Sequence, residues 1–149
     1  MTRKGFVVWL TGLSGSGKTT IGRSLKTQLE ELGMKVELLD GDEVRKQLSP
    51  DLGFTKNDRE MHARRVVYLS KLLARNGIVT LVSLIAPYRS FRESARNEIG
   101  DYVEVWIQKF VSSIVVVQIK LCFESQSNCF FLCYNFYCHS ITSIIQRGR

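Results

Sequence analysis

Short apolar runs alternate with longer amphipathic stretches through residues 1–108 of the chain. Four of these runs are rich in β-branched and other apolar residues: Phe6–Thr11, Val36–Leu39, Ile78–Leu84 and Val103–Ile107. Their shortness and continuous apolar character are typical of strands buried on both faces of a parallel sheet. Strands that alternate with helices predict an α/β fold, a three-layer arrangement with a parallel sheet between helices.

The stretches between the runs carry helix signals. Thr19–Leu32 and Asp58–Arg75 have amphipathic patterns, and a glycine that tolerates the left-handed conformation closes each of them. A third helix is expected to begin at Pro87-Tyr88-Arg89 and to end near Gly100. The three helices fall between the predicted strands, as a parallel sheet requires.

Single residues predict the start and the buried face of the helix over 58–75. Thr55 is followed three residues later by Asp58, which is the spacing of a capping box. Small and apolar residues recur at helical spacing and should form the stripe that packs on the sheet. These residues are Ala63, Val66, Val67, Ser70, Leu73 and Ala74.

The composition is that of one compact globular domain. The 149 residues are 44% hydrophobic and 23% charged, and the formal net charge of +7 favours anionic partners without identifying them. No apolar run approaches the roughly 18 residues that a membrane span needs. The apolar run that follows Arg3-Lys4 is too short for a signal sequence. We therefore expect a cytoplasmic protein with no membrane partner.

Residues 109–149 differ in composition from the rest of the chain. They hold all four cysteines and carry four basic side chains against one acidic side chain. The cysteine spacing does not match a zinc site, helix periodicity is absent, and the uncharged run Ile114–Val117 favours a strand. We interpret the chain as a domain over 1–108 followed by an atypical, hydrophobic Cys- and Phe-rich tail over 109–149.

The segment Gly12–Thr19 fits the phosphate-binding pattern G-x-x-x-x-G-K-[S/T] and lies between a predicted strand and a predicted helix. Backbone N–H groups of such a loop converge on phosphates, Lys18 would reach the β- and γ-phosphates, and the Thr19 hydroxyl would bind magnesium. A glycine-rich turn with an incidental lysine is the alternative. The residues expected to bind ATP are Gly12, Leu13, Ser14, Gly15, Ser16, Gly17, Lys18, Thr19 and Thr20.

Two carboxylates follow the second predicted strand. Asp40 and Asp42 are expected at its carboxyl edge beside the phosphate loop, placed to hold magnesium-bound water or to orient an acceptor hydroxyl. Asp42 has an equally good explanation as the cap of the following helix, whereas Asp40 has no such alternative. The candidate catalytic residues are Lys18, Asp40 and Asp42, and the candidate metal ligands are Thr19 and Asp40.

Basic side chains recur at the same predicted edge and indicate a crevice for a multiply anionic substrate, although any one of them could be surface charge. They are Arg45, Arg59, Arg89 and Arg92. Arg59 and His62 share a helix face that can point at this crevice. A solvated arginine and a structural histidine are the alternatives for these two residues. Arg64 and Arg65 are expected on a solvated face.

Five blocks of sequence occur in a characteristic order. They are Gly-Leu-Ser-Gly-Ser-Gly-Lys-Thr-Thr at 12–20, Leu-Asp-Gly-Asp-Glu-Val-Arg at 39–45, Asp-Leu-Gly-Phe-Thr-Lys-Asn-Asp-Arg at 51–59, Ala-Arg-Arg-Val at 63–66 and Pro-Tyr-Arg at 87–89. Over residues 5 to about 108 the chain therefore resembles adenylylsulfate kinase. That family uses ATP to phosphorylate the 3′-hydroxyl of adenosine 5′-phosphosulfate, which gives PAPS and ADP in sulfate assimilation. The resemblance implies a P-loop nucleoside triphosphate hydrolase-like kinase fold.

The resemblance also implies ligands and residue roles. ATP and Mg²⁺ would be the cofactors, adenosine 5′-phosphosulfate the substrate, and a homodimer the assembly, with no nucleic-acid partner. Phe54 would stack on the adenine of the sulfonucleotide, and Arg45 and Arg59 would grip its phosphosulfate; a buried loop anchor is the alternative for Phe54. The substrate-binding residues implied are Asp42, Arg45, Phe54, Arg59, His62, Ala86, Pro87, Tyr88 and Arg89.

Three departures from the family pattern carry consequences. His62 replaces the usual asparagine, so we expect an altered affinity for the substrate. Ala86 replaces a serine that has been considered a phosphoryl carrier, so we expect direct in-line transfer between the nucleotides. After Gln108 the family continues with a basic mobile lid, a second aromatic residue, residues around the ATP base and a final strand, none of which this sequence shows.

Three other functions stay open on the sequence alone. Another small-molecule kinase would share the phosphate loop, and a noncatalytic nucleotide-binding module would lack turnover. The sequence has neither an Asn-Lys-x-Asp guanine signature nor an Asp-x-x-Gly switch segment, which argues against that module. An inactive, truncated family member is the third alternative, because phosphoryl transfer needs water excluded from the γ-phosphate.

Overall fold

The computed structural model of the chain describes residues 4–86, 88–109, 115–122 and 132–135. No helix within them is long and apolar enough to cross a membrane. The elements follow in the order β1 (Val7–Thr11), α1 (Lys18–Glu31), β2 (Val36–Asp40), α2 (Gly41–Leu48), α3 (Lys56–Arg75), β3 (Val79–Ser83), α4 (Arg89–Ile99), β4 (Tyr102–Lys109), β5 (Val115–Cys122) and β6 (Leu132–Asn135).

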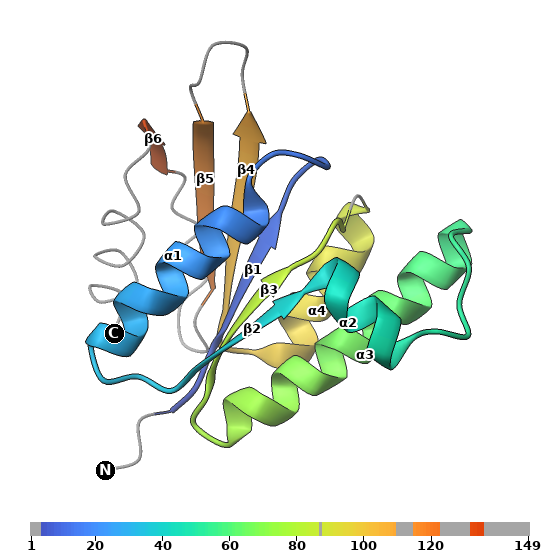
Figure 1. Cartoon of the computed structure of the whole chain (residues 1–149), viewed down its shortest axis with the longest axis horizontal. Coiled ribbons are helices and arrows are strands. Elements are labelled where there is room, and N and C mark those ends of the chain that lie inside the picture. The colour runs from blue at the N-terminus through green and yellow to red at the C-terminus, as the bar shows by residue number, and fades with distance from the viewer. Residues whose placement is uncertain (1–3, 87, 110–114, 123–131, 136–149) are drawn as a thin grey trace.

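The strands form one sheet in the order β2-β3-β1-β4-β5-β6. The first four are parallel, which confirms the predicted α/β fold with its parallel sheet. β5 and β6 are antiparallel and extend the sheet beyond β4 (Figure 1). β5 begins within the run that favoured a strand, so part of the tail continues the sheet of the preceding domain. The remaining predictions for the tail lie outside the described residues.

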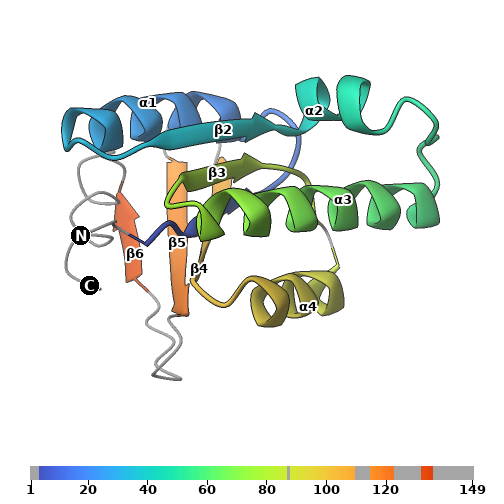
Figure 2. The same ribbon diagram turned by 90° about the horizontal axis from the view of Figure 1, so that it is seen from below.

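Helices cover both faces of the parallel strands, with α1 on one face and α3 and α4 on the other (Figure 2). The alternation of side chains along β1 explains this arrangement. Val8 and Leu10 pack with apolar residues of α1, whereas Val7 and Trp9 pack with residues of α3 and α4. Because both faces are covered, all five residues of β1 are buried.

α3 begins and packs as its sequence predicts. The Thr55 hydroxyl accepts a hydrogen bond from the Asp58 backbone N–H at 3.2 Å, and the Asp58 carboxylate accepts one from the Thr55 N–H at 3.2 Å. This reciprocal pair is a capping box. The predicted stripe faces the sheet: all of its residues are buried except Leu73, which is partly buried against the same core.

Candidate active site

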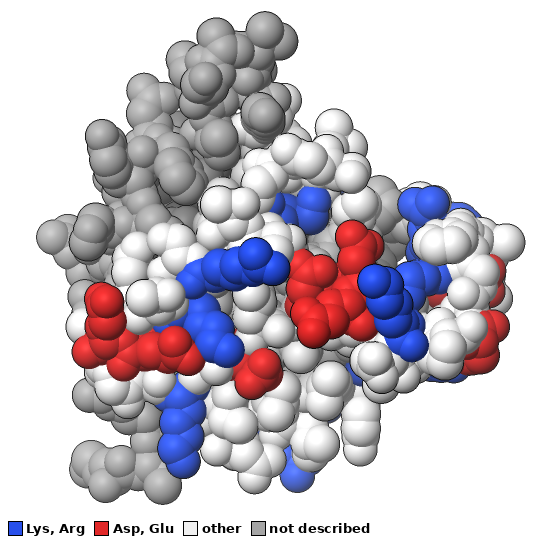
Figure 3. Space-filling model, in the orientation of Figure 1, with Lys and Arg blue, Asp and Glu red and all other residues white. Residues whose placement is uncertain are grey.

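A cleft of about 470 Å³ opens at the carboxyl ends of the central strands. Figure 3 shows an acidic patch over α2, whose first turn carries Asp42 and Glu43, with lysine and arginine side chains on both sides of it. The cleft is lined by Ser14, Gly15, Gly17, Lys18, Thr19, Thr20, Asp40, Gly41, Asp42, Arg45, Phe54, Arg59, His62, Ser83, Leu84 and Ile85. Most side chains that the sequence selected therefore lie around one space.

The loop between β1 and α1 has the backbone of a phosphate-binding loop. Gly15 and Gly17 have φ angles of 73° and 94°, which residues other than glycine rarely adopt. A Cβ at position 12 would overlap the carbonyl oxygen of Ile107 in β4, so Gly12 is required by close packing. The Ile21 N–H donates to the Gly17 carbonyl and continues the helix, which leaves the N-terminus of α1 directed at the cleft.

Three of the residues predicted to bind ATP do not line the cleft. Leu13 is 80% exposed at the tip of the loop, and Gly12 lies behind it against β4. Ser16 is buried, and its hydroxyl has no hydrogen-bond partner among the described residues. The Ser16 backbone N–H donates to the Leu13 carbonyl at 3.2 Å, so it braces the loop, whereas Leu13 can still take part in binding through its backbone N–H, which is how phosphate loops hold anions.

Lys18 is folded back onto its own loop. Its ammonium donates hydrogen bonds to the carbonyl oxygens of Gly12 at 3.0 Å and Leu13 at 2.7 Å. Burial lowers the pKa of Lys18, and the charges of Asp42 and Asp40 oppose that shift. Two neutral carbonyls compensate a buried cation less well than anionic oxygens do, so this ammonium is suited to bind phosphate.

Three oxygen-bearing side chains meet beside the loop. The Thr19 hydroxyl donates to the Asp40 carboxylate at 2.6 Å, and the Ser83 hydroxyl lies 3.4 Å from the Thr19 hydroxyl. Hydroxyl and carboxylate oxygens are ligands that Mg²⁺ accepts, together with water and phosphate oxygens. No group of three or more His, Cys, Asp or Glu side chains in the described residues could hold a metal ion. Magnesium would therefore need phosphate or water oxygens here.

Asp40, not Asp42, caps α2. The Asp40 carboxylate accepts a hydrogen bond from the Asp42 backbone N–H at 3.2 Å, so the expectation that only Asp42 could act as a cap is wrong. Its other oxygen accepts from Thr19, and both oxygens are thereby fixed in direction. Asp42 lies in the first turn of α2 and borders the cleft, where its carboxylate can meet an acceptor hydroxyl.

Arg45, Phe54 and Arg59 form the opposite wall. The Arg45 guanidinium lies over the Phe54 ring, 4.7 Å from its centroid, and donates to the Gly53 carbonyl. Arg59 donates to the Phe54 carbonyl at 2.9 Å. Phe54 is 74% exposed, so the alternative of a buried loop anchor is wrong. Two arginines thus hold the backbone of a loop that presents an aromatic face to the cleft.

His62 combines the two interpretations made from the sequence. It is only 2% exposed, and its Nδ1 lies 2.9 Å from the Ser49 hydroxyl, so it has a structural partner. It also borders the cleft. Burial lowers the pKa of His62, and the nearby charges of Arg45 and Arg65 lower it further, so the imidazole is neutral at pH 7.

Arg65 is partly exposed, in line with the expected solvated face, but it is also held in an ion pair there. Its guanidinium donates to both carboxylate oxygens of Asp51, at 2.6 and 2.7 Å, and to the Leu48 carbonyl at 2.9 Å. The hydrogen bonds from Arg65 lower the pKa of Asp51 to about 2. The pair ties Asp51, at the start of the loop that contains Phe54, to helix α3. Sequence reasoning missed it because the partners are 14 residues apart and no spacing rule joins them.

The segment between β3 and α4 borders the cleft only in part. Leu84 and Ile85 line it, whereas Ala86 is buried at 3% exposure. Tyr88 is the N-cap residue of α4, and its ring lies 4.7 Å from the Lys56 ammonium at the start of α3. Pro87, which the sequence placed in the acceptor pocket, lies outside the described residues.

Arg89 and Arg92 of α4 do not line the cleft and instead pair with carboxylates. Arg89 is exposed and pairs with Glu93 at 2.8 Å, and this carboxylate raises the pKa of Arg89. Arg92 donates to Glu104 at 2.9 Å and to the Ala86 carbonyl at 2.7 Å. The expectation that Arg92 belongs to the basic crevice is therefore wrong.

A parallel sheet, a phosphate loop at the head of α1 and a hydroxyl-carboxylate pair beside it define a nucleotide-binding protein of the P-loop kinase class. A sequence model described as adenylylsulphate kinase matches residues 4–125. The chain belongs to the adenylylsulfate kinase family. The match reaches beyond Gln108, where the family motifs found in the sequence end.

Individual relatives agree with the family match. The chain is 57% identical over 104 residues to a probable adenylyl-sulfate kinase of Pyrococcus abyssi, covering 70% of this chain and 60% of that protein. A Mycobacterium tuberculosis APS kinase, solved in complex with AMPPNP and APS, is 39% identical with a TM-score of 0.67, over 70% of this chain and 62% of that one. A hexameric APS kinase from Thiobacillus denitrificans is 37% identical with a TM-score of 0.66, over 75% of this chain and 24% of that one.

The matched segment is only part of these relatives. The chain spans about 60% of the length of the curated relative from Pyrococcus abyssi. The activity of the whole relative is therefore a proposal for this chain.

Proposed function

We propose that the chain transfers the γ-phosphoryl group of ATP to the 3′-hydroxyl of adenosine 5′-phosphosulfate, giving PAPS and ADP. The observation that carries the proposal is that the phosphate loop, Asp42 and the Arg45–Phe54–Arg59 wall all line one cleft. A donor triphosphate and an anionic, aromatic acceptor can both bind there. The solved relative with bound AMPPNP and APS supports this pairing of ligands.

On the donor side, the backbone of residues 12–20 and Lys18 bind the phosphates. Lys18 exchanges its bonds to the Gly12 and Leu13 carbonyls for phosphate oxygens, and its charge stabilises the negative charge that spreads during transfer. Thr19 and Asp40 are the residues that would hold Mg²⁺. When bound, Mg²⁺ supplies charge neutralisation at the phosphates.

On the acceptor side, Phe54 stacks on the adenine, while Arg45 and Arg59 bind the phosphosulfate. Asp42 accepts a hydrogen bond from the 3′-hydroxyl and directs it at the γ-phosphorus. The oxygen–phosphorus bond forms as the bond to the ADP oxygen breaks, and the hydroxyl proton leaves to solvent. Ala86 has no hydroxyl, so no phosphoenzyme forms at that position, and the transfer is direct.

The test is ADP release from ATP with four acceptors in parallel: adenylylsulfate, gluconate, shikimate and nucleoside monophosphates. We expect adenylylsulfate to give the highest kcat/KM, with PAPS as the product by chromatography. A preference for any other acceptor would identify a different small-molecule kinase. Tight GTP binding with no turnover on any acceptor would identify a noncatalytic nucleotide-binding module.

We also propose that the chain self-associates as a homodimer. The family membership supports this assembly, and the relative from Thiobacillus denitrificans is described as hexameric. Light scattering coupled to gel filtration measures the mass directly against the 17.0 kDa of one chain. A monomeric mass across the micromolar range would refute the proposal.

A further inference from the structure

Glu104 is a carboxylate placed on the apolar surface of the sheet. In β4 it stands opposite Trp9 of the neighbouring strand β1. The alternation of side chains along β4 directs Glu104 to the face covered by α3 and α4, and its side chain is only 11% exposed. A carboxylate removed from water in this way is strongly destabilising unless cations and hydrogen-bond donors compensate it.

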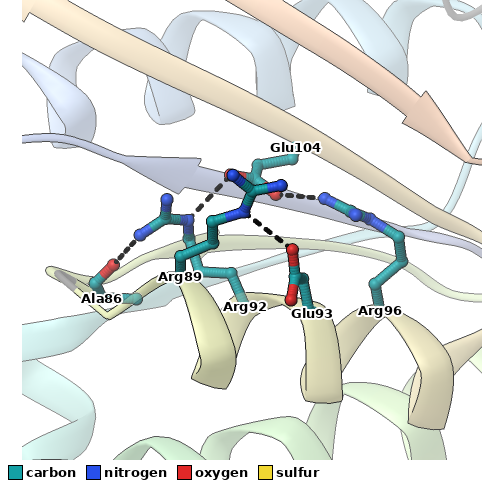
Figure 4. A network of polar contacts seen from close by, with 6 residues as sticks. All are labelled: Ala86, Arg89, Arg92, Glu93, Arg96 and Glu104. Atoms are coloured by element: carbon teal, nitrogen blue, oxygen red, sulfur yellow. Dashed lines mark hydrogen bonds and ion pairs between the residues drawn. The ribbon is translucent and has the colours of Figure 1, made fainter. Parts of the chain in front are cut away.

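Two arginines of α4 compensate Glu104, one for each carboxylate oxygen (Figure 4). Arg92 donates through Nε to Oε1 at 2.9 Å, and Arg96 donates through Nη2 to Oε2 at 2.6 Å. They are four residues apart, which is one helical turn, so both reach the same strand residue. Their side chains are 22% and 15% exposed, so their environments are similar.

The two arginines differ in what else they contact. Arg92 donates its second hydrogen bond to the Ala86 carbonyl at 2.7 Å, in the segment that leaves β3 for α4 (Figure 4). Arg96 lies instead over the ring of Tyr102, 5.7 Å from its centroid. The β3–α4 segment consists of residues 84–88, and among its described residues, 84–86 and 88, the hydrogen bond from Arg92 to Ala86 is the connection to Glu104.

The described residues of the β3–α4 segment, 84–86 and 88, have no regular secondary structure. Its first residues, Leu84 and Ile85, line the cleft. The Leu84 N–H is bonded to the Leu10 carbonyl at 3.3 Å, and two residues later the Ala86 carbonyl is bonded to Arg92. The segment is thus held at its beginning by β1 and further along by a guanidinium whose direction Glu104 sets.

We infer that Arg92 is a positioning residue for the acceptor nucleotide: oriented by Glu104, it holds the Ala86 carbonyl and so fixes the segment that the acceptor contacts. A planar guanidinium can donate to both partners at once in a fixed geometry, which a lysine ammonium cannot reproduce. The identity of the acceptor is taken from the proposed function. The claim that Arg92 orders the segment is independent of it.

The matched variants are Arg92→Lys and Arg96→Lys. Each keeps a positive charge beside Glu104, and each removes one guanidinium of similar burial from α4. Only Arg92→Lys removes the bond to Ala86. A general loss of stability should therefore affect both variants alike, and a thermal unfolding curve for each one measures that loss.

The first measurement uses the protein without substrates. Hydrogen–deuterium exchange of peptides that cover residues 84–88 should be faster in Arg92→Lys than in the wild type, and unchanged in Arg96→Lys. Peptides from the phosphate loop act as the internal reference. Unchanged exchange in Arg92→Lys, or equal acceleration in both variants, overturns the inference.

The second measurement separates the two substrates. In Arg92→Lys we expect the KM for adenylylsulfate to rise about tenfold, as loss of one well-placed hydrogen bond to a charged group predicts, while the KM for ATP stays within about twofold. In Arg96→Lys both values should stay within about twofold. Equal rises in both KM values, or in both variants, contradict positioning of the acceptor.

The two proposals can fail separately. If the wild type does not phosphorylate adenylylsulfate, the proposed function fails, and the exchange measurement still decides whether Arg92 orders the segment. If the wild type is active and only the exchange or KM predictions fail, the function stands and the inference about Arg92 is wrong.

Discussion

The Lys18 ammonium is a buried cation with no anionic hydrogen-bond partner among the described residues. It is buried, its pKa is lowered, and its hydrogen bonds go to two neutral carbonyls. Its contribution to folding is small because burial opposes its charge, and in the proposed transfer phosphate oxygens would compensate that charge fully.

Replacing Lys18 with alanine should reduce kcat by about 10² to 10³, as removal of one preorganised charge from a transferring group does. The free energy of unfolding should change little, for the reason just given. Lys26→Ala is the control, since Lys26 lies on the same helix and pairs only weakly with Glu30 at 3.9 Å. Steady-state kinetics and urea unfolding measure both effects. Equal losses of kcat in both variants would contradict the role of Lys18.

His62 predicts how stability depends on pH. Its pKa in the folded protein is lower than its ordinary value of 6.5, so the unfolded chain binds more protons as the pH falls through 6.5. The free energy of unfolding should therefore decrease below pH 6.5 and be greatest above it. Asp51, with a pKa lowered to about 2 from 3.8, acts only at much lower pH, where its pair with Arg65 is lost as the carboxylate is protonated.

The variant His62→Asn removes this titration. Urea unfolding at pH 5.5 and pH 7.5 should show a smaller pH dependence in the variant than in the wild type. His139 is common to both proteins, so its contribution cancels. An identical pH dependence in the two proteins would show that His62 does not titrate in this range.

At the scale of elements, the start of α3 controls the placement of the Phe54 loop. The capping box fixes the helix end, and Arg59 in the first turns of α3 binds the Phe54 carbonyl. Removing the cap should therefore affect stability and leave the phosphate loop unchanged, because the two are on different elements.

Thr55→Ala should lower the free energy of unfolding by about 1 kcal/mol, the usual cost of losing a helix N-cap. Thr27→Ala is the matched control: Thr27 lies within α1, its hydroxyl bonds only to the Arg23 carbonyl of the same helix, and alanine favours helix interiors. Chemical denaturation of the three proteins gives the comparison. A loss of stability from Thr27→Ala as large as that from Thr55→Ala would show that capping is not the cause.

Local patterns predicted the elements well because each depends on neighbours in the chain. The strand predicted over Val36–Leu39 is Val36–Asp40, and the helix predicted over Asp58–Arg75 is Lys56–Arg75. The phosphate loop could be predicted for the same reason, because all of its residues lie in one continuous segment. The roles of Arg65 and Arg92 were not readable, because their partners are brought near only by the packing of α3 and α4.

At the scale of the whole molecule, we propose a kinase domain over residues 1–108 joined to a tail that adds strands to its sheet. The tail pairs with β4 along the full length of that strand, from Tyr102–Cys122 to Lys109–Val115. The resemblance to the family implies a basic lid after Gln108, and the tail offers few cations for that work.

A chimera tests this division. Replacing residues 109–149 with the corresponding ending of the Pyrococcus abyssi relative should raise kcat, because a closing lid excludes water and holds both nucleotides in line. The KM for ATP and the KM for adenylylsulfate are measured alongside. Equal kcat values for the chimera and the original chain would show that the tail does not limit turnover.

The close approach of Gly12 to the Ile107 carbonyl connects the tail to the phosphate loop. Ile107 abuts the phosphate loop and is also paired with Val117 of β5, so one residue of β4 has the phosphate loop on one side and the tail on the other. Neighbouring strands are about 4.8 Å apart, so a change in how the tail pairs with β4 would displace the backbone of the phosphate loop. Sequence changes after residue 109 should thus be detectable as altered ATP affinity, even when the acceptor wall is untouched.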